Sequence, residues 1–160
     1  MIEKLETAAE LEPDNASIFT TLGNVYDQQY QEALEGDDAE KTESLFKSSM
    51  SNYQKALGIS PNDFAATYSI GALYYNKAAA YSKIVNALAE DYSKEGTKKY
   101  EAKKAEMDAL FDEALPWFEK AEALQGDDAN TLIALKEIHA RKGDFEKSNE
   151  YKAKIEALPK

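Results

Sequence analysis

Large and small side chains recur along this chain at two fixed spacings, and this recurrence constrains the fold more than any other feature. The first spacing places Phe19, Leu22, Gly23 and Tyr26 at the first, fourth, fifth and eighth positions of a segment. The same spacing recurs at residues 67–74 and 132–139, although the last copy ends on a histidine. Side chains three and four residues apart share one face of an α-helix. The spacing therefore predicts helices that pack through one face on their neighbours.

A second spacing follows each copy of the first and also opens the chain. It places Ser49, Tyr53 and Ala56 at the first, fifth and eighth positions of a segment, and related segments begin at residues 1, 114 and 148. The alternation of the two spacings resembles the tetratricopeptide repeat, a helix–turn–helix unit with a period of about 34 residues. The resemblance implies an all-α solenoid of helical hairpins, in which stacked hairpins form a concave groove for partner proteins.

The repeat boundaries predict a single tetratricopeptide domain over residues 1–160. It would consist of a half repeat at 1–15 and full repeats at 16–63, 64–128 and 129–160. The first two full repeats exceed the usual period of about 34 residues, and the excess lies between the two helices of each. Because a helix can lengthen by whole turns without rotating its apolar face, we expect longer helices in 16–63. We expect one extended helical hairpin in 64–128, with a kink at Pro116.

Glycines followed by an oxygen-bearing side chain mark several expected helix boundaries. Glycine tolerates the left-handed conformation that ends a helix, and the oxygen caps the first N–H groups of the next one. The pairs are Gly36-Asp37, Gly96-Thr97 and Gly143-Asp144. With the prolines between repeats, they predict seven helices near 1–12, 16–35, 38–58, 64–94, 97–125, 129–142 and 144–158.

Composition limits which partners the chain is expected to bind and which types of site it can form. The formal net charge is −11 and the chain has no cysteine. Because a phosphate backbone is usually held by a basic patch, the charge predicts that nucleic acid is not a partner. The lack of cysteine removes disulfides and thiolate zinc sites. The sequence has no apolar run of about 18 residues, so we expect no insertion into a membrane.

The resemblance implies a set of groove residues. In tetratricopeptide proteins the groove is lined by the first helix of each repeat, on the face turned away from the packing. Carried onto this chain, these positions are rich in amide and tyrosine groups and include Asn24, Asp27, Gln28, Tyr68, Tyr75, Asn76, Glu137 and Arg141. Amides can meet a peptide backbone and tyrosines supply amphipathic area. The resemblance thus implies a non-catalytic scaffold for a peptide or protein partner, although the same residues could form a merely solvated face.

The expected tip of the long hairpin carries a second candidate surface. It holds five lysines, Lys94, Lys98, Lys99, Lys103 and Lys104. They could form a docking tip for an acidic partner, or a solvated helix end paired with neighbouring glutamates. An alternative function is structural self-association, in which a homo-oligomer forms through the hairpin 64–125 and buries Tyr81, Leu88 and Tyr92.

Nothing in the sequence indicates catalysis. The single histidine, His139, occupies the position where the repeat usually has tyrosine, so we interpret it as a packing residue. It has no partner at the spacing of a metal site, and no phosphate-binding glycine loop or nucleophile motif occurs. We therefore expect no enzymatic activity, no cofactor and no bound metal.

Two features bear on the origin of the chain. Met1 falls where the second helix of a repeat should already be under way, so we expect a fragment that lacks its natural N-terminus. The Tyr- and Lys-rich extensions and the run at 115–121 resemble tetratricopeptide proteins exported by Gram-negative bacteria. This resemblance favours a periplasmic or exported location over a cytoplasmic one.

Overall fold

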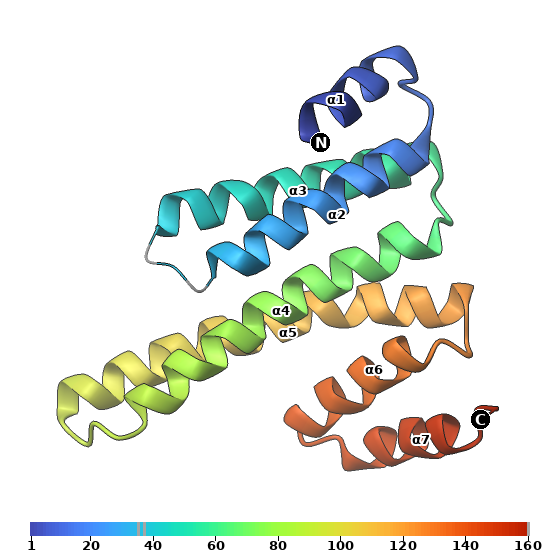
Figure 1. Ribbon diagram of the computed structural model, residues 1–160. Helices are drawn as coiled ribbons and strands as arrows, with labels where there is room; N and C mark the ends of the chain where they lie inside the picture. Colours follow the sequence, from blue (N-terminus) through green and yellow to red (C-terminus); the bar gives the residue numbers. More distant parts are fainter. Residues whose placement is uncertain (35, 37, 160) are drawn as a thin grey trace. The chain divides into compact units, whose positions relative to one another are not determined.

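α-Helices joined by short turns make up the described chain, residues 1–34, 36 and 38–159 of a computed structural model (Figure 1). In order they are α1 (Ile2–Leu11), α2 (Ala16–Ala33), α3 (Ala39–Ile59), α4 (Phe64–Leu88), α5 (Lys94–Leu124), α6 (Ala129–Arg141) and α7 (Phe145–Glu156). No strand occurs among these residues. The prediction of an all-α fold of helical hairpins is confirmed, and the order of the helices agrees with it.

The chain divides into two compact units. Unit 1 is Met1–Asn76 and unit 2 is Lys77–Lys160, so the division lies within α4. Unit 1 contains α1, the hairpin of α2 and α3, and the first part of α4. Unit 2 contains the rest of α4, then α5, and the hairpin of α6 and α7. The repeat boundaries at 15, 63 and 128 coincide with turns between helices and otherwise stay a prediction.

The core of unit 1 forms where α3 crosses close to the backbone of α2. A Cβ atom added at Gly23 would lie 2.4 Å from a ring carbon of Tyr53, so only glycine leaves room for that ring. Beside it, the Ser49 hydroxyl donates to the backbone oxygen of Gly23 at 2.9 Å. Phe19, Leu22, Ala56 and Ala66 form a buried cluster on which α1 packs through Ile2, Leu5 and Ala9.

The longer helices expected in repeat 16–63 are held together by aromatic side chains. Near the far end of the α2–α3 hairpin, the Tyr30 ring meets Phe46 edge-on with centroids 5.5 Å apart. Phe46 in turn meets Tyr74 of α4 at 5.8 Å. Edge-to-face pairs at this distance add to the stabilisation from apolar burial. The inserted residues therefore extend the hairpin and its core together.

Acidic side chains cap the starts of α3, α6 and α7. Asp38 accepts from the backbone N–H of Lys41 at 2.9 Å and caps α3, whereas the predicted cap Asp37 lies outside the described residues. Asp128 accepts from both the backbone N–H and the hydroxyl of Thr131 and caps α6. At the α6–α7 turn, Gly143 has φ +76 and Asp144 accepts from the N–H of Lys147, as predicted.

The prediction that Gly96 ends a helix is wrong. α4 ends at Leu88 and α5 begins at Lys94, with Ser93 as its cap, so Gly96 lies in the first turn of α5. A Cβ at Gly96 would lie 2.2 Å from the side chain of Asp91. The glycine is thus required by close packing of the turn and not by a left-handed backbone.

α5 packs through a stripe of buried side chains at steps of three and four residues. The stripe consists of Met107, Phe111, Ala114, Phe118 and Ala121. α5 continues as one helix through Pro116, whose ring lies on the exposed side. The kink expected at this proline stays a prediction.

Candidate partner-binding surfaces

In unit 1, two predicted groove residues of α2 lie around a buried tyrosine hydroxyl. Tyr53 is fully buried, and its hydroxyl donates to the side-chain oxygen of the exposed residue Asn24 at 2.8 Å. The hydroxyl of Ser69 on α4 hydrogen-bonds to the same phenol. An amide whose oxygen is engaged still has two N–H donors. The core of the hairpin therefore fixes the orientation of a hydrogen-bonding group on the exposed face of α2.

The electrostatics of this cluster favour an uncharged phenol beside a partly desolvated carboxylate. Burial raises the pKa of Tyr53 to about 12, and the nearby Asp27 carboxylate adds to the effect. Burial also raises the pKa of Asp27, while the hydrogen bond from Gln31 at 3.0 Å lowers it. A carboxylate that has lost part of its hydration makes stronger hydrogen bonds to a charged donor.

The remaining groove residues of unit 1 come from α2 and α4. Gln28 is exposed, and its amide donates to Glu32 at 3.3 Å. On α4, the ring of Tyr68 stacks on Phe64 with centroids 6.0 Å apart, and Tyr75 and Asn76 are half-buried. Of the predicted set, Asn24 accepts from the Tyr53 hydroxyl and Asp27 acts on it electrostatically, and Gln28, Tyr68, Tyr75 and Asn76 extend the surface along the two helices.

In unit 2, the predicted groove residues of α6 take part in packing. The guanidinium of Arg141 lies 4.6 Å from the centroid of the Phe111 ring on α5. Such a cation–π contact stabilises the packing of α6 on α5. Glu137 is half-buried on the same helix. Arg141 therefore has a structural contact that its assignment to a groove did not anticipate.

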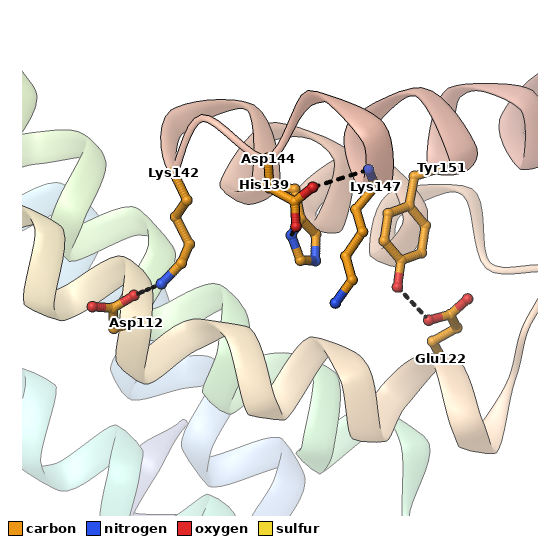
Figure 2. A network of polar contacts seen from close by, with 7 residues as sticks. All are labelled: Asp112, Glu122, His139, Lys142, Asp144, Lys147 and Tyr151. Atoms are coloured by element: carbon orange, nitrogen blue, oxygen red, sulfur yellow. Dashed lines mark hydrogen bonds and ion pairs between the residues drawn. The ribbon is translucent and has the colours of Figure 1, made fainter.

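A polar network joins α5, α6 and α7 (Figure 2). His139 is buried, its ring stacks on Tyr151 at 5.7 Å, and its Nδ1 atom lies 3.4 Å from an Asp144 oxygen. Tyr151 donates to Glu122 at 2.9 Å, and Lys142 pairs with Asp112. The histidine is in the packing position that the sequence predicted.

The tip lysines mostly have partners on their own helix. Lys99 pairs with Glu95 at 2.8 Å, Lys103 with Glu106 at 2.7 Å, and Lys104 with Asp108 at 2.5 Å. Lys103 also lies 4.5 Å from the centroid of the Tyr81 ring. Lys94 and Lys98 are exposed. These contacts match the description of the tip as a solvated helix end with paired charges.

A cleft between α1, α2 and α3 was not found by sequence reasoning. It has a volume of about 890 Å³ and is lined on the α3 side by small polar residues, including Ser44, Ser48, Ser51 and Asn52. The sequence signal for it is this stripe of small side chains at spacings of three and four residues. The stripe alone does not predict a cleft, because the cleft forms only where α1, α2 and α3 come together.

Comparison with known proteins confirms the fold. No protein-family model and no curated protein sequence matches the chain. Two solved structures of monomeric IFIT1 mutants, one with Gppp-AAAA and the other, which carries one further substitution, with m7Gppp-AAAA, each match with a TM-score of 0.55 and 17% identity. Each match covers 98% of this chain, which spans 36% of the length of the IFIT1 chain. The chain thus has a tetratricopeptide-type helical-repeat fold.

The exclusion of nucleic acid as a partner is wrong. The IFIT1 chains that share this fold are solved with capped RNA oligonucleotides. Net charge is a sum over the whole surface, whereas RNA recognition also uses local stacking on aromatic side chains and hydrogen bonds to bases. A net charge of −11 therefore does not remove RNA from the classes of partner available to this fold.

Among residues 1–34, 36 and 38–159, no helix is both long and apolar enough to cross a membrane. In the same residues, no group of three or more His, Cys, Asp or Glu side chains is arranged to hold a metal ion.

Proposed function

We propose that this chain is a non-catalytic interaction module that holds a peptide or protein partner on the exposed faces of α2 and α4 in unit 1. The observation that carries the proposal is the hydrogen bond from the buried Tyr53 to the exposed Asn24. It fixes a side-chain amide before any partner arrives. Preorganisation of this kind lowers the entropic cost of binding.

The chemistry of the surface suits an extended peptide. Asn24 offers N–H donors for a peptide carbonyl, and Asp27 offers an acceptor for a peptide N–H or a basic side chain. Tyr68 and Tyr75 supply rigid apolar area with a polar end, which is why tyrosine is common where proteins bind partners. An amide, a carboxylate and two tyrosines together provide both hydrogen bonding and apolar contact.

A second candidate partner is RNA, and the comparison with IFIT1 favours it. The same tyrosines could stack on bases, and the same amide could read a base edge. Peptide and RNA partners differ in a way that can be measured directly, because a nuclease destroys only one of them.

A pull-down from an extract of the source cells tests the proposal. The wild-type chain is compared with Tyr68→Ala/Tyr75→Ala and with Lys94→Glu/Lys98→Glu at the hairpin tip, each after circular dichroism has confirmed its helical content. We expect a protein partner that is lost only with the tyrosine pair and survives treatment with ribonuclease. Loss after ribonuclease would identify an RNA partner, and loss only with the tip variant would contradict the proposal.

Self-association through the long hairpin is a further candidate function. Tyr92 is 91% exposed and Ile84 is 45% exposed near the tip, so apolar area is available there for a second copy. Tyr81 and Leu88, named with Tyr92 in the prediction, are half-buried. Light scattering over a range of concentrations should show a mass that rises in the wild type and not in Ile84→Ser/Tyr92→Ser. A monomer at all concentrations would remove this candidate.

We also propose that the protein works outside the cytoplasm of a bacterium. The resemblance of the extensions and of residues 115–121 to exported tetratricopeptide proteins supports this location. Cell fractionation with an antibody against the chain checks it, and recovery in the cytoplasmic fraction would contradict it.

A further inference from the structure

Unit 1 contains an open cleft whose floor is apolar. The cleft has a volume of about 890 Å³ and lies between α1 and α3, with α2 beneath. Phe19 and Leu22 of α2 lie at its floor and are only 8% and 3% exposed, and Ala9 of α1 is half-buried at its side. Tyr26 borders it, and its hydroxyl donates to Glu6 of α1 at 2.9 Å. Clefts of several hundred cubic ångströms with apolar floors are typical of ligand sites.

Both walls of this α1–α3 cleft carry carboxylates. Glu6 and Glu10 come from α1, and Glu40 and Glu43 come from α3. The lining also holds two lysines: Lys47 pairs with Glu43 at 3.7 Å, and Lys55 lies 5.6 Å from the centroid of Phe19. The four carboxylates outnumber the two lysines, and Glu6, Glu10 and Glu40 are exposed. Because an excess of one charge on the walls of a cleft attracts the opposite charge, the cleft favours a positively charged occupant.

The α3 wall provides space and hydrogen bonds. Ser44, Ser48, Ser51 and Asn52 recur at the spacing of one helix face, and their small side chains leave room between α3 and α1. Asn52 donates to the backbone oxygen of Ser48 at 2.8 Å, which fixes its amide along the wall. Hydroxyl and amide groups can bond to the backbone of a bound segment.

We propose that the α1–α3 cleft is a docking site for a basic peptide segment in which an aliphatic or aromatic side chain is flanked by lysine or arginine. The apolar side chain lies beside the half-buried Ala9 and Tyr26, and the flanking cations meet Glu6 and Glu10 of α1 and Glu40 of α3. This surface is separate from that of the proposed function, because Asn24, Asp27 and Gln28 lie on a different face of α2 from Phe19, Leu22 and Tyr26. The two sites can therefore be lost independently.

Titration with a designed peptide tests the docking site. The probe is a fluorescein-labelled peptide with lysine and arginine on both sides of a Trp-Leu pair, followed by fluorescence anisotropy. Ser51→Trp fills the cleft without changing the charge, and Gln54→Trp places the same side chain on an exposed part of α3 that does not line the cleft. We expect Ser51→Trp to weaken binding on the order of tenfold or more, which corresponds to the loss of one strong contact, and Gln54→Trp to leave it unchanged.

Charge and peptide controls complete the test. Glu10→Lys/Glu40→Lys should weaken binding of the peptide. Glu146→Lys/Glu150→Lys on α7 makes the same change of net charge and should leave the affinity for the peptide almost unchanged. A peptide with Ser-Ser in place of Trp-Leu should bind more weakly, and circular dichroism shows whether each variant is folded. Three results would overturn the proposal: no saturable binding of the probe, equal effects of the two tryptophan variants, or equal effects of the two charge variants. So would a dimer that Ser51→Trp dissociates, because a second copy would then occupy the cleft.

Discussion

Tyr53 in unit 1 and Tyr151 in unit 2 are both tyrosines on the second helix of a hairpin, yet their surroundings differ. Tyr53 is fully buried over a glycine and donates to the neutral amide of Asn24. Tyr151 is half-buried, stacks on His139 and donates to the carboxylate of Glu122, which also pairs with Lys154 at 2.6 Å. The ring on the second helix thus makes a neutral, buried contact in unit 1 and a charged, partly exposed contact in unit 2.

The contacts of Tyr53 and Tyr151 place different requirements on the neighbouring helix. A fully buried ring requires the neighbouring helix to leave out its side chain, and Gly23 does this. A half-buried ring requires no glycine, because it lies against another ring and bonds to a charge at the edge of the packing. We therefore expect the unit 1 contact to be sensitive to volume and the unit 2 contact to be sensitive to charge.

The largest expected effect comes from removing the two rings. Tyr53→Ala should lower the free energy of unfolding by about 3–5 kcal/mol, because it leaves a cavity in a buried core. Tyr151→Ala should cost about half as much, since its ring is only partly removed from water. Urea denaturation followed by circular dichroism measures both. Equal losses would show that the two contacts do not differ in burial as described.

The next effect tests the space at Gly23. Gly23→Ala should destabilise by about 1–3 kcal/mol, since the added methyl group overlaps the ring of Tyr53. Gly58→Ala is the matched control on α3, where nothing lies within 4 Å of the added Cβ. Alanine is favoured over glycine in a helix, so this variant should gain about 0.5–1 kcal/mol. Opposite signs in urea denaturation support the account, and a neutral Gly23→Ala contradicts it.

A smaller effect concerns alkaline pH. Because the folded state raises the pKa of Tyr53 from its usual 10.0 to about 12, it binds the phenolic proton more tightly than the unfolded state does. The resulting stability is complete below pH 10 and is lost as pH rises toward 12. Unfolding free energies measured across this interval should therefore fall less steeply for Tyr53→Phe than for the wild type. Parallel curves would mean that the phenol is not held as described.

The smallest effect concerns salt. Lys154 is 52% exposed by side chain and Glu122 is 20% exposed, so their pair should contribute about 0.5 kcal/mol at low ionic strength. Lys154→Ala should lose this amount in low salt and almost nothing in molar salt, where charges are screened. Asn24→Ala in unit 1 serves as the comparison, because its bond to Tyr53 is between neutral groups and should respond little to salt.

Local patterns in the sequence were enough to predict the fold, because most helices carry an apolar stripe or a capping side chain of their own. Gly143 and Asp144 end one helix and begin the next as their chemistry requires. The prediction that Gly96 ends a helix is wrong because a glycine needed for close packing looks the same in sequence as one needed for a left-handed turn. Only the position of Asp91 distinguishes the two.

The surfaces were less predictable than the helices. Lys152 stands where the repeat usually has an aromatic residue, but Tyr151, one residue earlier, provides the ring that stacks on His139. Sequence spacing could not show this shift, since it depends on where α7 begins. The α1–α3 cleft and the contact of Arg141 with Phe111 depend on side chains from separate helices, which no single stripe reveals.

Site-specific photo-crosslinking shows whether the exposed face of α2 holds a protein partner. A photoreactive amino acid replaces Gln28 on the exposed face of α2, and in a control chain it replaces Gln54 on α3. After irradiation in an extract of the source cells, the adducts are divided into portions treated with ribonuclease or with protease. We expect a discrete protein adduct at residue 28 that resists ribonuclease. The substitution Tyr68→Ala/Tyr75→Ala should abolish this adduct, and the control chain with the photoreactive amino acid at residue 54 should not form it. Equal adducts at both positions, or an adduct at residue 28 that ribonuclease removes, would contradict it.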